Sequence, residues 1–203
     1  RGPAKEVGKN ISMQKIVVGL TGRLASGKGT ITRHLVETYK ADKTRSSDPL
    51  RETLDIFSIP QTREHLDALS TFVRETYGEN VIAQAVKRYL AKSEAGVVIF
   101  DGMRRLVDVE MIRSFEHSLF IFVDTNRDVR YIRSVGRNEN IGDDTMTYEE
   151  FLAKDSDEPQ QQIEALKEYA DVVLDNNGSP EELSKQLSEK VDAALEKLLA
   201  HKE

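Results

Sequence analysis

Residues 22–28 read Gly22-Arg23-Leu24-Ala25-Ser26-Gly27-Lys28 and match the pattern Gly-x-x-x-x-Gly-Lys. A β-branched run at residues 15–20 precedes it, and the residues Ile31, Leu35 and Val36 that follow have the spacing of one helical face. Glycines between a strand and a helix let the backbone curl so that successive N–H groups point inward, and the helix N-terminus adds positive partial charge. The stretch therefore predicts a phosphate-binding loop, called the P-loop below, between the first strand and the first helix.

We expect the P-loop to hold the triphosphate of ATP, with Lys28 bridging the β- and γ-phosphates. Gly29 occupies the place of the Ser or Thr that usually binds Mg²⁺ in this pattern, and Thr30 follows one residue later. Thr30 is therefore the predicted hydroxyl ligand of Mg²⁺. The predicted nucleotide-binding residues of this segment are Gly22, Ala25, Ser26, Gly27, Lys28, Gly29 and Thr30.

Beyond the P-loop, strand and helix signals alternate along the chain. Residues 97–100 and 118–123 are continuous apolar runs, of the kind buried on both faces of a parallel sheet. Weaker strand signals lie at residues 43–47 and 170–174. Strands separated by single helices imply right-handed crossovers. The sequence predicts an α/β three-layer P-loop NTPase fold, with a five-stranded parallel sheet and helices on both faces, in a single domain over residues 13–203.

Capping residues mark several helix boundaries. Asp48 can cap a helix that has Pro49 at its first position. The stretches Thr147-Tyr148-Glu149-Glu150 and Ser179-Pro180-Glu181-Glu182 begin with the pattern of a capping box. The helix that starts at the second of these carries an apolar stripe to its end, which can pack on the sheet or in a dimer: Leu183, Leu187, Val191, Leu195 and Leu198.

Charge is unevenly distributed along the 203 residues, whose net charge is -6. Residues 1–137 carry 23 Lys and Arg against 17 Asp and Glu, whereas residues 138–203 carry 6 lysines, no arginine and 18 acidic residues. Because arginine grips phosphate through a planar fork, this skew favours a small polyanionic ligand over nucleic acid or a membrane surface. The oligomeric state is left open.

The composition also bounds the setting in which the protein works. The chain has no cysteine, which excludes disulfides, thiolate zinc sites and cysteine nucleophiles, and which is typical of a cytoplasmic protein. No apolar run approaches the ~20 residues needed to span a bilayer. Residues 1–12 are polar and lack the apolar core of a signal peptide, so we expect a disordered leader or an expression remnant.

Several motifs resemble those of adenylate kinase and its relatives, the nucleoside monophosphate kinases. The string Gly27-Lys28-Gly29-Thr30 is shared with them, and Ser47-Asp48-Pro49-Leu50-Arg51 resembles the element that begins their acceptor-binding segment. The resemblance implies that Asp48 and Arg51 bind the acceptor, and that Mg²⁺ is held largely through water. It also implies a mobile helical acceptor-binding insertion over about residues 48–95, in which Arg63 and Arg74 are further candidates.

The stretch Phe100-Asp101-Gly102-Met103-Arg104-Arg105 resembles the Asp-Gly-x-x-Arg element of the same family. An Asp at the carboxyl end of a strand beside the P-loop can orient a hydrated Mg²⁺, and a following Arg can reach the transferred phosphate. We therefore expect Asp101 to serve as a catalytic and metal-binding residue together with Thr30. Either Arg104 or Arg105 would contact the acceptor.

The stretch Arg133-Ser134-Val135-Gly136-Arg137 resembles the start of the family's lid, which would span about residues 137–148. Arg133 and Arg137 would close on the ATP phosphates and exclude water, and Arg130, one turn earlier, could join them. Adenylate kinases with longer lids bring further arginines from the far side, but no arginine follows Arg137 here.

The closest resemblance is therefore to the short-lid branch, which contains dephospho-CoA kinase and small archaeal nucleotide kinases. Residues 170–179 are similar to a dephospho-CoA kinase segment whose loop passes the adenine, which implies that Asn177 and Gly178 lie at the nucleotide base.

Three activities fit these residues. The first is transfer of the γ-phosphate of ATP to a nucleotide-type acceptor, such as a ribo- or deoxynucleoside monophosphate, by positioning and charge neutralisation. Its predicted catalytic residues are Lys28, Asp101, Arg133 and Arg137. The second is dephospho-CoA kinase activity, in which Asp48 or Asp101 would act as the base. The third is a regulatory module that binds or slowly hydrolyses ATP without passing phosphate to an acceptor.

Overall fold

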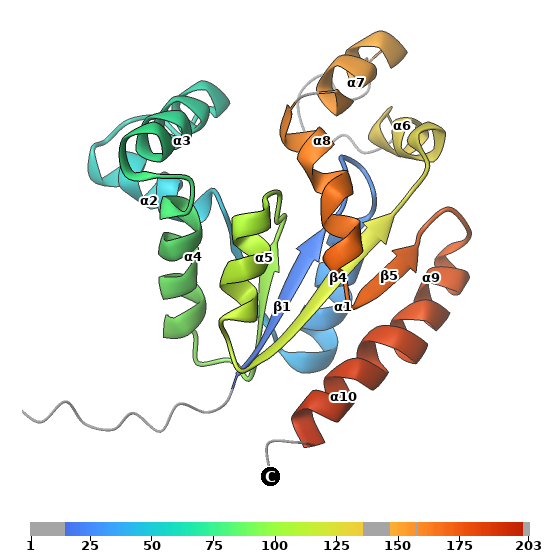
Figure 1. The fold of residues 1–203 in the computed structure, drawn as a ribbon. Coiled ribbons are helices and arrows are strands. Elements are labelled where there is room, and N and C mark those ends of the chain that lie inside the picture. The colour runs from blue at the N-terminus through green and yellow to red at the C-terminus, as the bar shows by residue number, and fades with distance from the viewer. Residues whose placement is uncertain (1–14, 136–146, 157, 201–203) are drawn as a thin grey trace, which may run out of the picture.

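The computed structural model describes residues 15–135, 147–156 and 158–200. Five strands form one parallel sheet in the order β2-β3-β1-β4-β5 (Figure 1). In the central strand, Ile16 pairs with Val97 on one side and with His117 on the other. The predicted five-stranded parallel sheet is therefore confirmed. Its strands are β1 (Ile16–Thr21), β2 (Asp42–Arg45), β3 (Val97–Asp101), β4 (His117–Asp124) and β5 (Val172–Asp175).

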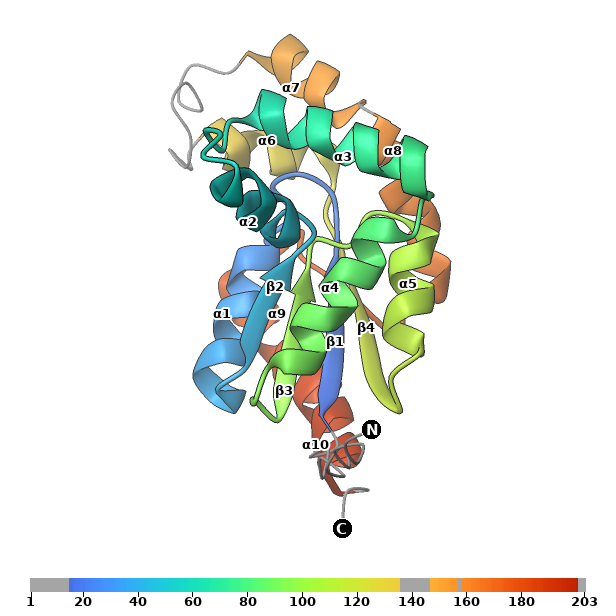
Figure 2. The same cartoon turned by 90° about the vertical axis from the view of Figure 1, so that its left-hand side faces the viewer.

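Helices cover both faces of the sheet, which makes the predicted three layers (Figure 2). One face packs against α1 (Lys28–Tyr39), α9 (Pro180–Gln186), a π-helical turn η3 (Leu187–Asp192) and α10 (Ala193–Ala200). The other packs against α4 (Val81–Lys92), α5 (Leu106–Arg113) and a 3₁₀ turn η2 (Leu166–Tyr169). The apolar stripe of the C-terminal helices thus packs on the sheet, with Leu187 and Val191 in the π-helical turn that interrupts the expected continuous helix.

Two groups of helices stand above the carboxyl edge of the sheet, on opposite sides of the P-loop (Figure 1). One contains α2 (Asp48–Ile56) and α3 (Arg63–Tyr77), which with α4 form the insertion between β2 and β3. The other contains α6 (Arg127–Val135), α7 (Tyr148–Asp155) and α8 (Glu158–Ala165). Because the carboxyl ends of parallel strands meet at this edge, both groups can reach a ligand held by the P-loop.

Both predicted capping boxes are present: the Thr147 hydroxyl accepts from Glu150 N, and the Ser179 hydroxyl accepts from Glu182 N. The predicted cap at Asp48 is wrong by one residue, since Ser47 is the N-cap of α2. The Asp48 carboxylate turns back instead and accepts from Arg45 N at 2.7 Å.

Some expectations fall on other parts of the chain. The leader at residues 1–12 and most of the lid, including Arg137, lie outside the described residues. No helix in the described part of the chain is both long and apolar enough to cross a membrane.

Candidate nucleotide-binding site

The P-loop curls through backbone conformations that favour glycine. Gly22 and Gly27 have φ values of +150° and +99°, and Ala25 between them has φ +58°. A Cβ on Gly22 would lie 2.6 Å from Ser26 Oγ, and a Cβ on Gly27 would collide with the side-chain nitrogen of Asn176. The two glycines of the motif are therefore required both by φ and by close packing.

Side chains from distant parts of the sequence hold the carbonyl groups of the P-loop from outside. Ser26 O accepts from Asn176 Nδ2 at 2.8 Å and from Thr125 Oγ1 at 3.0 Å. Leu24 O accepts from Arg130 Nη1 at 3.3 Å. In a trans peptide the N–H points opposite to the carbonyl. The N–H groups that follow these two carbonyls, on Gly27 and Ala25, therefore face away from the side chains that hold the loop. This arrangement presents donors to an anion inside the loop.

Arg130 has a different place from the one expected at the lid. Its side chain is only 2% exposed and makes a two-pronged contact with Asp155, at 2.6 and 3.0 Å. Its Nε also donates to Thr125 O at 3.0 Å. Arg130 therefore joins the P-loop, the end of β4 and the end of α7, and it positions the loop rather than contacting a phosphate.

The groups inside the P-loop fit a phosphate. Lys28 Nζ donates to Gly22 O at 2.6 Å and to Arg23 O at 3.0 Å, so the ammonium lies across the loop. Ser26 Oγ is buried and has no hydrogen-bond partner among the described residues. A buried hydroxyl without a partner is costly, and a phosphate oxygen would satisfy it.

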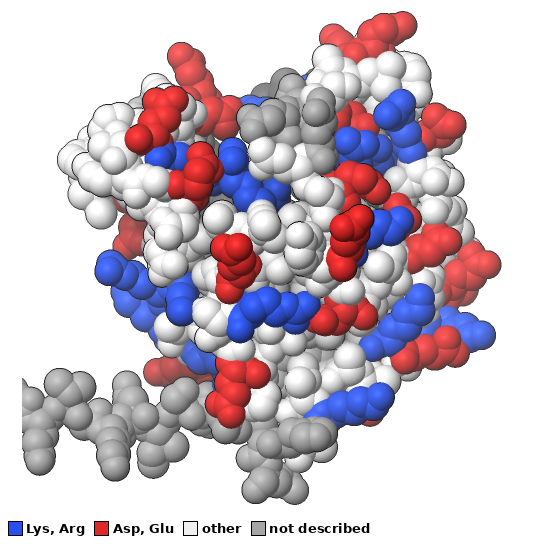
Figure 3. Space-filling model, viewed as in Figure 1, with Lys and Arg blue, Asp and Glu red and all other residues white. Residues whose placement is uncertain are grey.

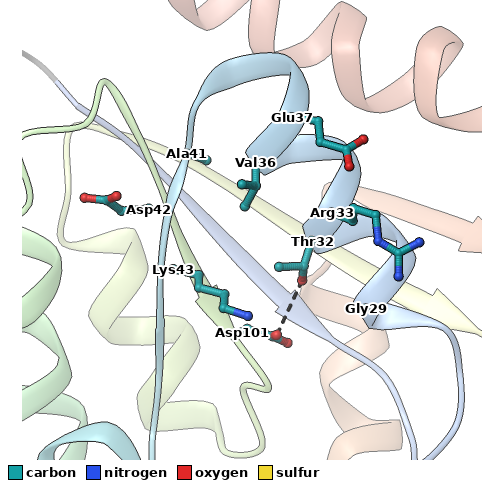
Figure 4. Close-up of a pocket in the computed structure, with 9 residues that line it drawn as sticks. All are labelled: Gly29, Thr32, Arg33, Val36, Glu37, Ala41, Asp42, Lys43 and Asp101. Atoms are coloured by element: carbon teal, nitrogen blue, oxygen red, sulfur yellow. Dashed lines mark hydrogen bonds between the residues drawn. The ribbon is translucent and has the colours of Figure 1, made fainter.

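Asp101 lies at the end of β3, where it pairs in register with Leu20 of β1. Its Oδ2 accepts from Thr32 Oγ1 at 3.4 Å, on the wall of a cavity of about 630 Å³ (Figure 4). Thr30, the predicted partner of Asp101, lines a different cavity. The helical period explains this difference: around the helix axis, position 32 lies about 60° from Gly29, whereas position 30 lies about 100° from it on the other side.

These residues also fit a hydrated Mg²⁺. A carboxylate and a hydroxyl beside the P-loop are oxygen groups of the kind that Mg²⁺ accepts. Within the described ranges, no three acidic or histidine side chains gather as a metal site. Since Mg²⁺ commonly keeps several waters and one or two carboxylates, Asp101 with Thr32 suffices for such an ion.

A second cavity, of about 680 Å³, lies between α1 and α9, beside Ala25 and Gly27 of the P-loop. Arg133 lines it, as does Asn176, whose carbonyl accepts from Arg133 Nη1 at 2.8 Å. The side chain of Asn177, predicted to lie at the base, joins its own loop to the turn after β4: its Oδ1 accepts from Asn126 N at 2.7 Å, and its Nδ2 donates to Asp175 Oδ1 at 2.6 Å. At Gly178 a Cβ would collide with Glu182, so this glycine is needed for close packing.

On the other side of the P-loop, basic side chains gather in the hollow between α3 and α5 (Figure 3). Arg105 Nη1 contacts Glu79 Oε2 at 3.0 Å, and Arg74 Nε lies 3.8 Å from the same oxygen. Desolvation lowers the pKa of Arg74, and the charge of Arg105 lowers it further. Desolvation also lowers the pKa of Arg104, with the charge of Arg63 next. These arginines crowd one another, which favours binding of an anion.

Asp108 fixes the backbone beneath this arginine group. Its carboxylate is 7% exposed and accepts from Arg104 N at 2.9 Å and from Arg105 N at 3.0 Å. Burial raises the pKa of Asp108, while these two hydrogen bonds act in the opposite direction.

Of the other predicted acceptor residues, Arg51 donates to Gln61 Oε1 at 2.9 Å and keeps a buried Nε without a partner in the described structure.

The sequence reasoning missed Asp108, Thr32, Thr125, Asn176 and Asp155. Asp108 could have been found because a polar residue at the third position of a helix commonly caps the helix start. Thr32 could have been found because a residue three positions after Gly29 lies on the same side of the helix. Asn176 lies in the segment 170–179 that resembles a dephospho-CoA kinase loop, and for Thr125 and Asp155 the sequence carried no signal.

Comparison with known proteins agrees with this geometry. Residues 21–151 match the family model described as an AAA domain. The UPF0200 protein of Thermococcus kodakarensis is 30% identical over 188 residues, which cover 90% of this chain and 100% of that protein. A sugar kinase from Janibacter sp. has a TM-score of 0.54 at 18% identity, with 88% of this chain and 95% of that one covered. A shikimate kinase from Bacteroides thetaiotaomicron has a TM-score of 0.52 at 14% identity, with 89% and 98% covered. The fold is therefore that of the P-loop kinases.

Proposed function

We propose that this chain, which belongs to the UPF0200 family and matches the AAA domain family over residues 21–151, is an ATP-dependent phosphotransferase acting on a nucleotide-type acceptor. The acceptor that we propose is a ribo- or deoxynucleoside monophosphate. One observation carries this proposal: two separate cationic sites, the P-loop with Lys28 and the group of Arg74, Arg104 and Arg105, stand at the same edge of the sheet.

Hydrogen bonds tie the two sites together. Gly102 N and Met103 N donate to Leu20 O at 2.9 and 3.1 Å, and Thr21 Oγ1 donates to Met103 O at 2.5 Å. The turn that leads to the acceptor arginines is thereby attached to the strand that leads to the P-loop. Fixed positions for donor and acceptor supply most of what phosphoryl transfer requires.

The residues have distinct tasks in this proposal. Lys28 and the N–H groups of the P-loop bind the β- and γ-phosphates, while Arg104 and Arg105 bind the acceptor phosphate. Asp101 and Thr32 would hold a hydrated Mg²⁺, which neutralises charge on the transferred phosphate when it is bound. Because an acceptor phosphate oxygen is already ionised at neutral pH, no side chain has to remove a proton. The uneven charge supports a small-molecule partner in the cytoplasm, rather than nucleic acid or a membrane.

A hydroxyl acceptor is the second candidate, and the position of Asp101 favours it. A carboxylate beside the P-loop can take the proton of a sugar or ribose hydroxyl, as dephospho-CoA kinase activity would require. The similarity to structures described as a sugar kinase and a shikimate kinase supports the same candidate.

A coupled assay that follows ADP formation separates these candidates. It would be run across all ribo- and deoxynucleoside monophosphates, dephospho-CoA, gluconate and shikimate, always against ATP without an acceptor. We expect one monophosphate to be turned over well above bare ATP hydrolysis. Turnover of a hydroxyl acceptor alone supports the second candidate, and no turnover with any acceptor supports the regulatory module. Lys28→Ala should lower turnover by roughly 10²–10³-fold. Lys185→Ala, which removes a lysine that is 73% exposed on α9, should leave turnover unchanged.

A further inference from the structure

Glu79 is an exposed acidic residue at the arginine group that we assign to the acceptor phosphate. It lies in the turn between α3 and α4, beside the start of α5, and its side chain is 61% exposed (Figure 2). Its Oε2 accepts from Arg105 Nη1 at 3.0 Å, and Arg74 Nε lies 3.8 Å from the same oxygen. One carboxylate oxygen thus faces two guanidinium groups, whose side chains are only 25% and 16% exposed.

This contact leaves the two arginines incompletely satisfied. At 3.8 Å, Arg74 Nε is beyond hydrogen-bond distance from Glu79, and it is buried without a hydrogen-bond partner in the described part of the chain. Desolvation and the charge of Arg105 lower the pKa of Arg74, although the charges of Asp108 and Glu79 act in the opposite direction. The arginine group therefore still offers a buried donor and positive charge to an anion.

The other carboxylate at this group has a different role. Asp108 Oδ2 accepts from the backbone N–H groups of Arg104 and Arg105, at 2.9 and 3.0 Å, and the residue is only 7% exposed. Asp108 is therefore part of the frame that holds the arginines. Glu79, by contrast, contacts their side chains from the exposed side of the site.

The turn that carries Glu79 is held by its backbone. Gly78 N donates to Arg74 O at 2.8 Å, and Val81 N donates to Gly78 O at 3.1 Å. The Glu79 carboxylate can therefore leave the arginines by a change of side-chain rotamer while the turn keeps its place.

A phosphate is a better ligand for these two arginines than one carboxylate oxygen. A phosphomonoester carries a charge of about -1.5 to -2 at pH 7 and three acceptor oxygens, so it can accept from Arg105 Nη1 and Arg74 Nε together. An exposed ion pair such as Glu79–Arg105 contributes little, so displacing it costs little. A carboxylate on the acceptor would only exchange one single charge for another.

We propose that Glu79 competes with the acceptor phosphate for Arg105 and Arg74, and that its carboxylate is displaced when the acceptor binds. Glu79 thereby lowers the affinity of the site for anions in general and favours phosphomonoesters over carboxylates. This inference rests on the proposed function, because it presupposes that the arginine group binds the acceptor phosphate. It extends that function by assigning a residue that sets the affinity for the acceptor.

The test measures the binding of ribose 5-phosphate, the part that ribonucleoside 5′-monophosphates share, by calorimetry. A non-hydrolysable ATP analogue with Mg²⁺ would occupy the P-loop, so that the probe reports on the acceptor site. The proteins are the wild type, Glu79→Gln, Arg105→Gln, the double variant and Glu75→Gln. Glu75→Gln is the matched control, because it removes the same charge from an exposed position of α3. Urea unfolding of each variant would reveal a folding defect.

We expect Glu79→Gln to tighten the binding of ribose 5-phosphate by about threefold to fivefold, because a competing exposed ion pair is lost. Arg105→Gln should weaken binding by about tenfold through the loss of a charged hydrogen bond. The gain from Glu79→Gln should shrink in the Arg105→Gln background, since the two residues are in contact. Glu75→Gln should stay within about 1.5-fold of wild type, because a distant exposed charge is screened.

The sign of the effect separates competition from a structural role. A contact that only held Arg105 in place would weaken binding when it is lost. Binding that is unchanged, weaker or absent in Glu79→Gln, or an equal gain in Glu75→Gln, overturns the inference alone. A folded wild-type protein that binds neither the ATP analogue nor ribose 5-phosphate overturns the proposed function as well.

Discussion

Replacing Asp155 by Ala should destabilise the fold strongly, because it leaves the buried guanidinium of Arg130 without its counter-ion. Both side chains are 2% exposed, and they are joined by two hydrogen bonds of 2.6 and 3.0 Å. Removing one partner of such a buried pair costs roughly 3–5 kcal/mol, because the remaining charge stays buried and uncompensated. Small domains have unfolding free energies of about 5–15 kcal/mol, so the loss would be a large share of the total.

Urea unfolding followed by circular dichroism measures this loss. The matched control is Glu189→Gln, which breaks the Lys185–Glu189 contact of 3.8 Å between side chains that are 73% and 60% exposed. An exposed pair of this kind contributes only ~0.3–0.5 kcal/mol. If Asp155→Ala lowers the free energy of unfolding by less than about 1 kcal/mol, or by no more than the control does, then Arg130 is not held by a buried ion pair. Our account of how Arg130 holds the P-loop would then be wrong.

The same carboxylate should also produce a defined pH dependence. Burial alone would raise the pKa of Asp155, but the hydrogen bonds and charge of Arg130, with the charges of Arg23 and Arg127, outweigh it and lower the pKa. A carboxyl group with a lowered pKa in the folded state stabilises the fold above its unfolded pKa, about 3.9, and loses this contribution as the pH falls further. The difference in unfolding free energy between wild type and Asp155→Asn should therefore be constant from pH 7 to 5 and shrink below pH 4. A difference that widens on acidification would contradict the assigned contacts.

Three further substitutions test the site directly. Lys28→Ala should lower the rate of phosphoryl transfer by roughly 10²–10³-fold in the coupled assay, with an unchanged circular dichroism spectrum, because it removes a preorganised charge from the transferred phosphate; near-wild-type turnover would refute this role. Gly27→Ala should lower the free energy of unfolding in urea by about 1–3 kcal/mol, because φ is +99° and a Cβ would collide with Asn176. A loss of only a few tenths of a kcal/mol would contradict this account. Asp108→Ala should cost ~1–3 kcal/mol, because Arg104 N and Arg105 N lose their acceptor, and should raise the KM for the acceptor but not for ATP. Equal changes in both KM values would argue against a specific role for Asp108 at the acceptor.

Much of the fold could be predicted from the sequence, because its signals are local. The two glycines and Lys28 of the P-loop, the apolar runs of β3 and β4 and both capping boxes depend on residues within a few positions of one another. The cap of α2 was misplaced for a related reason. Asp48 can bond either to the helix that follows or to the backbone before it, and only the conformation of the preceding turn decides between them.

The candidate site was predicted less completely. The placement of Arg104 and Arg105 follows from a motif at the end of β3, and that of Arg133 from a motif at the end of α6. Thr30 was predicted because it follows Gly29 directly along the chain, whereas in the structure Thr32 is the residue whose hydroxyl donates to Asp101. Arg130 was assigned to the phosphates from its position before the lid, but its surroundings include the carbonyls of Leu24 and Thr125 and the carboxylate of Asp155, which only folding brings together.

The sequence alone therefore determined the class of this protein, since a strand, a glycine-rich turn and a helix in this order build a phosphate-binding loop from neighbouring residues. What holds that loop in shape follows only from the tertiary structure. Asn176 and Thr125 reach Ser26 across 150 and 99 residues of chain, and Arg130 meets Asp155 across 25 residues. Such contacts depend on side chains placed within about 3 Å of a partner, which sequence spacing cannot specify. They exist only once the sheet and its helices have packed.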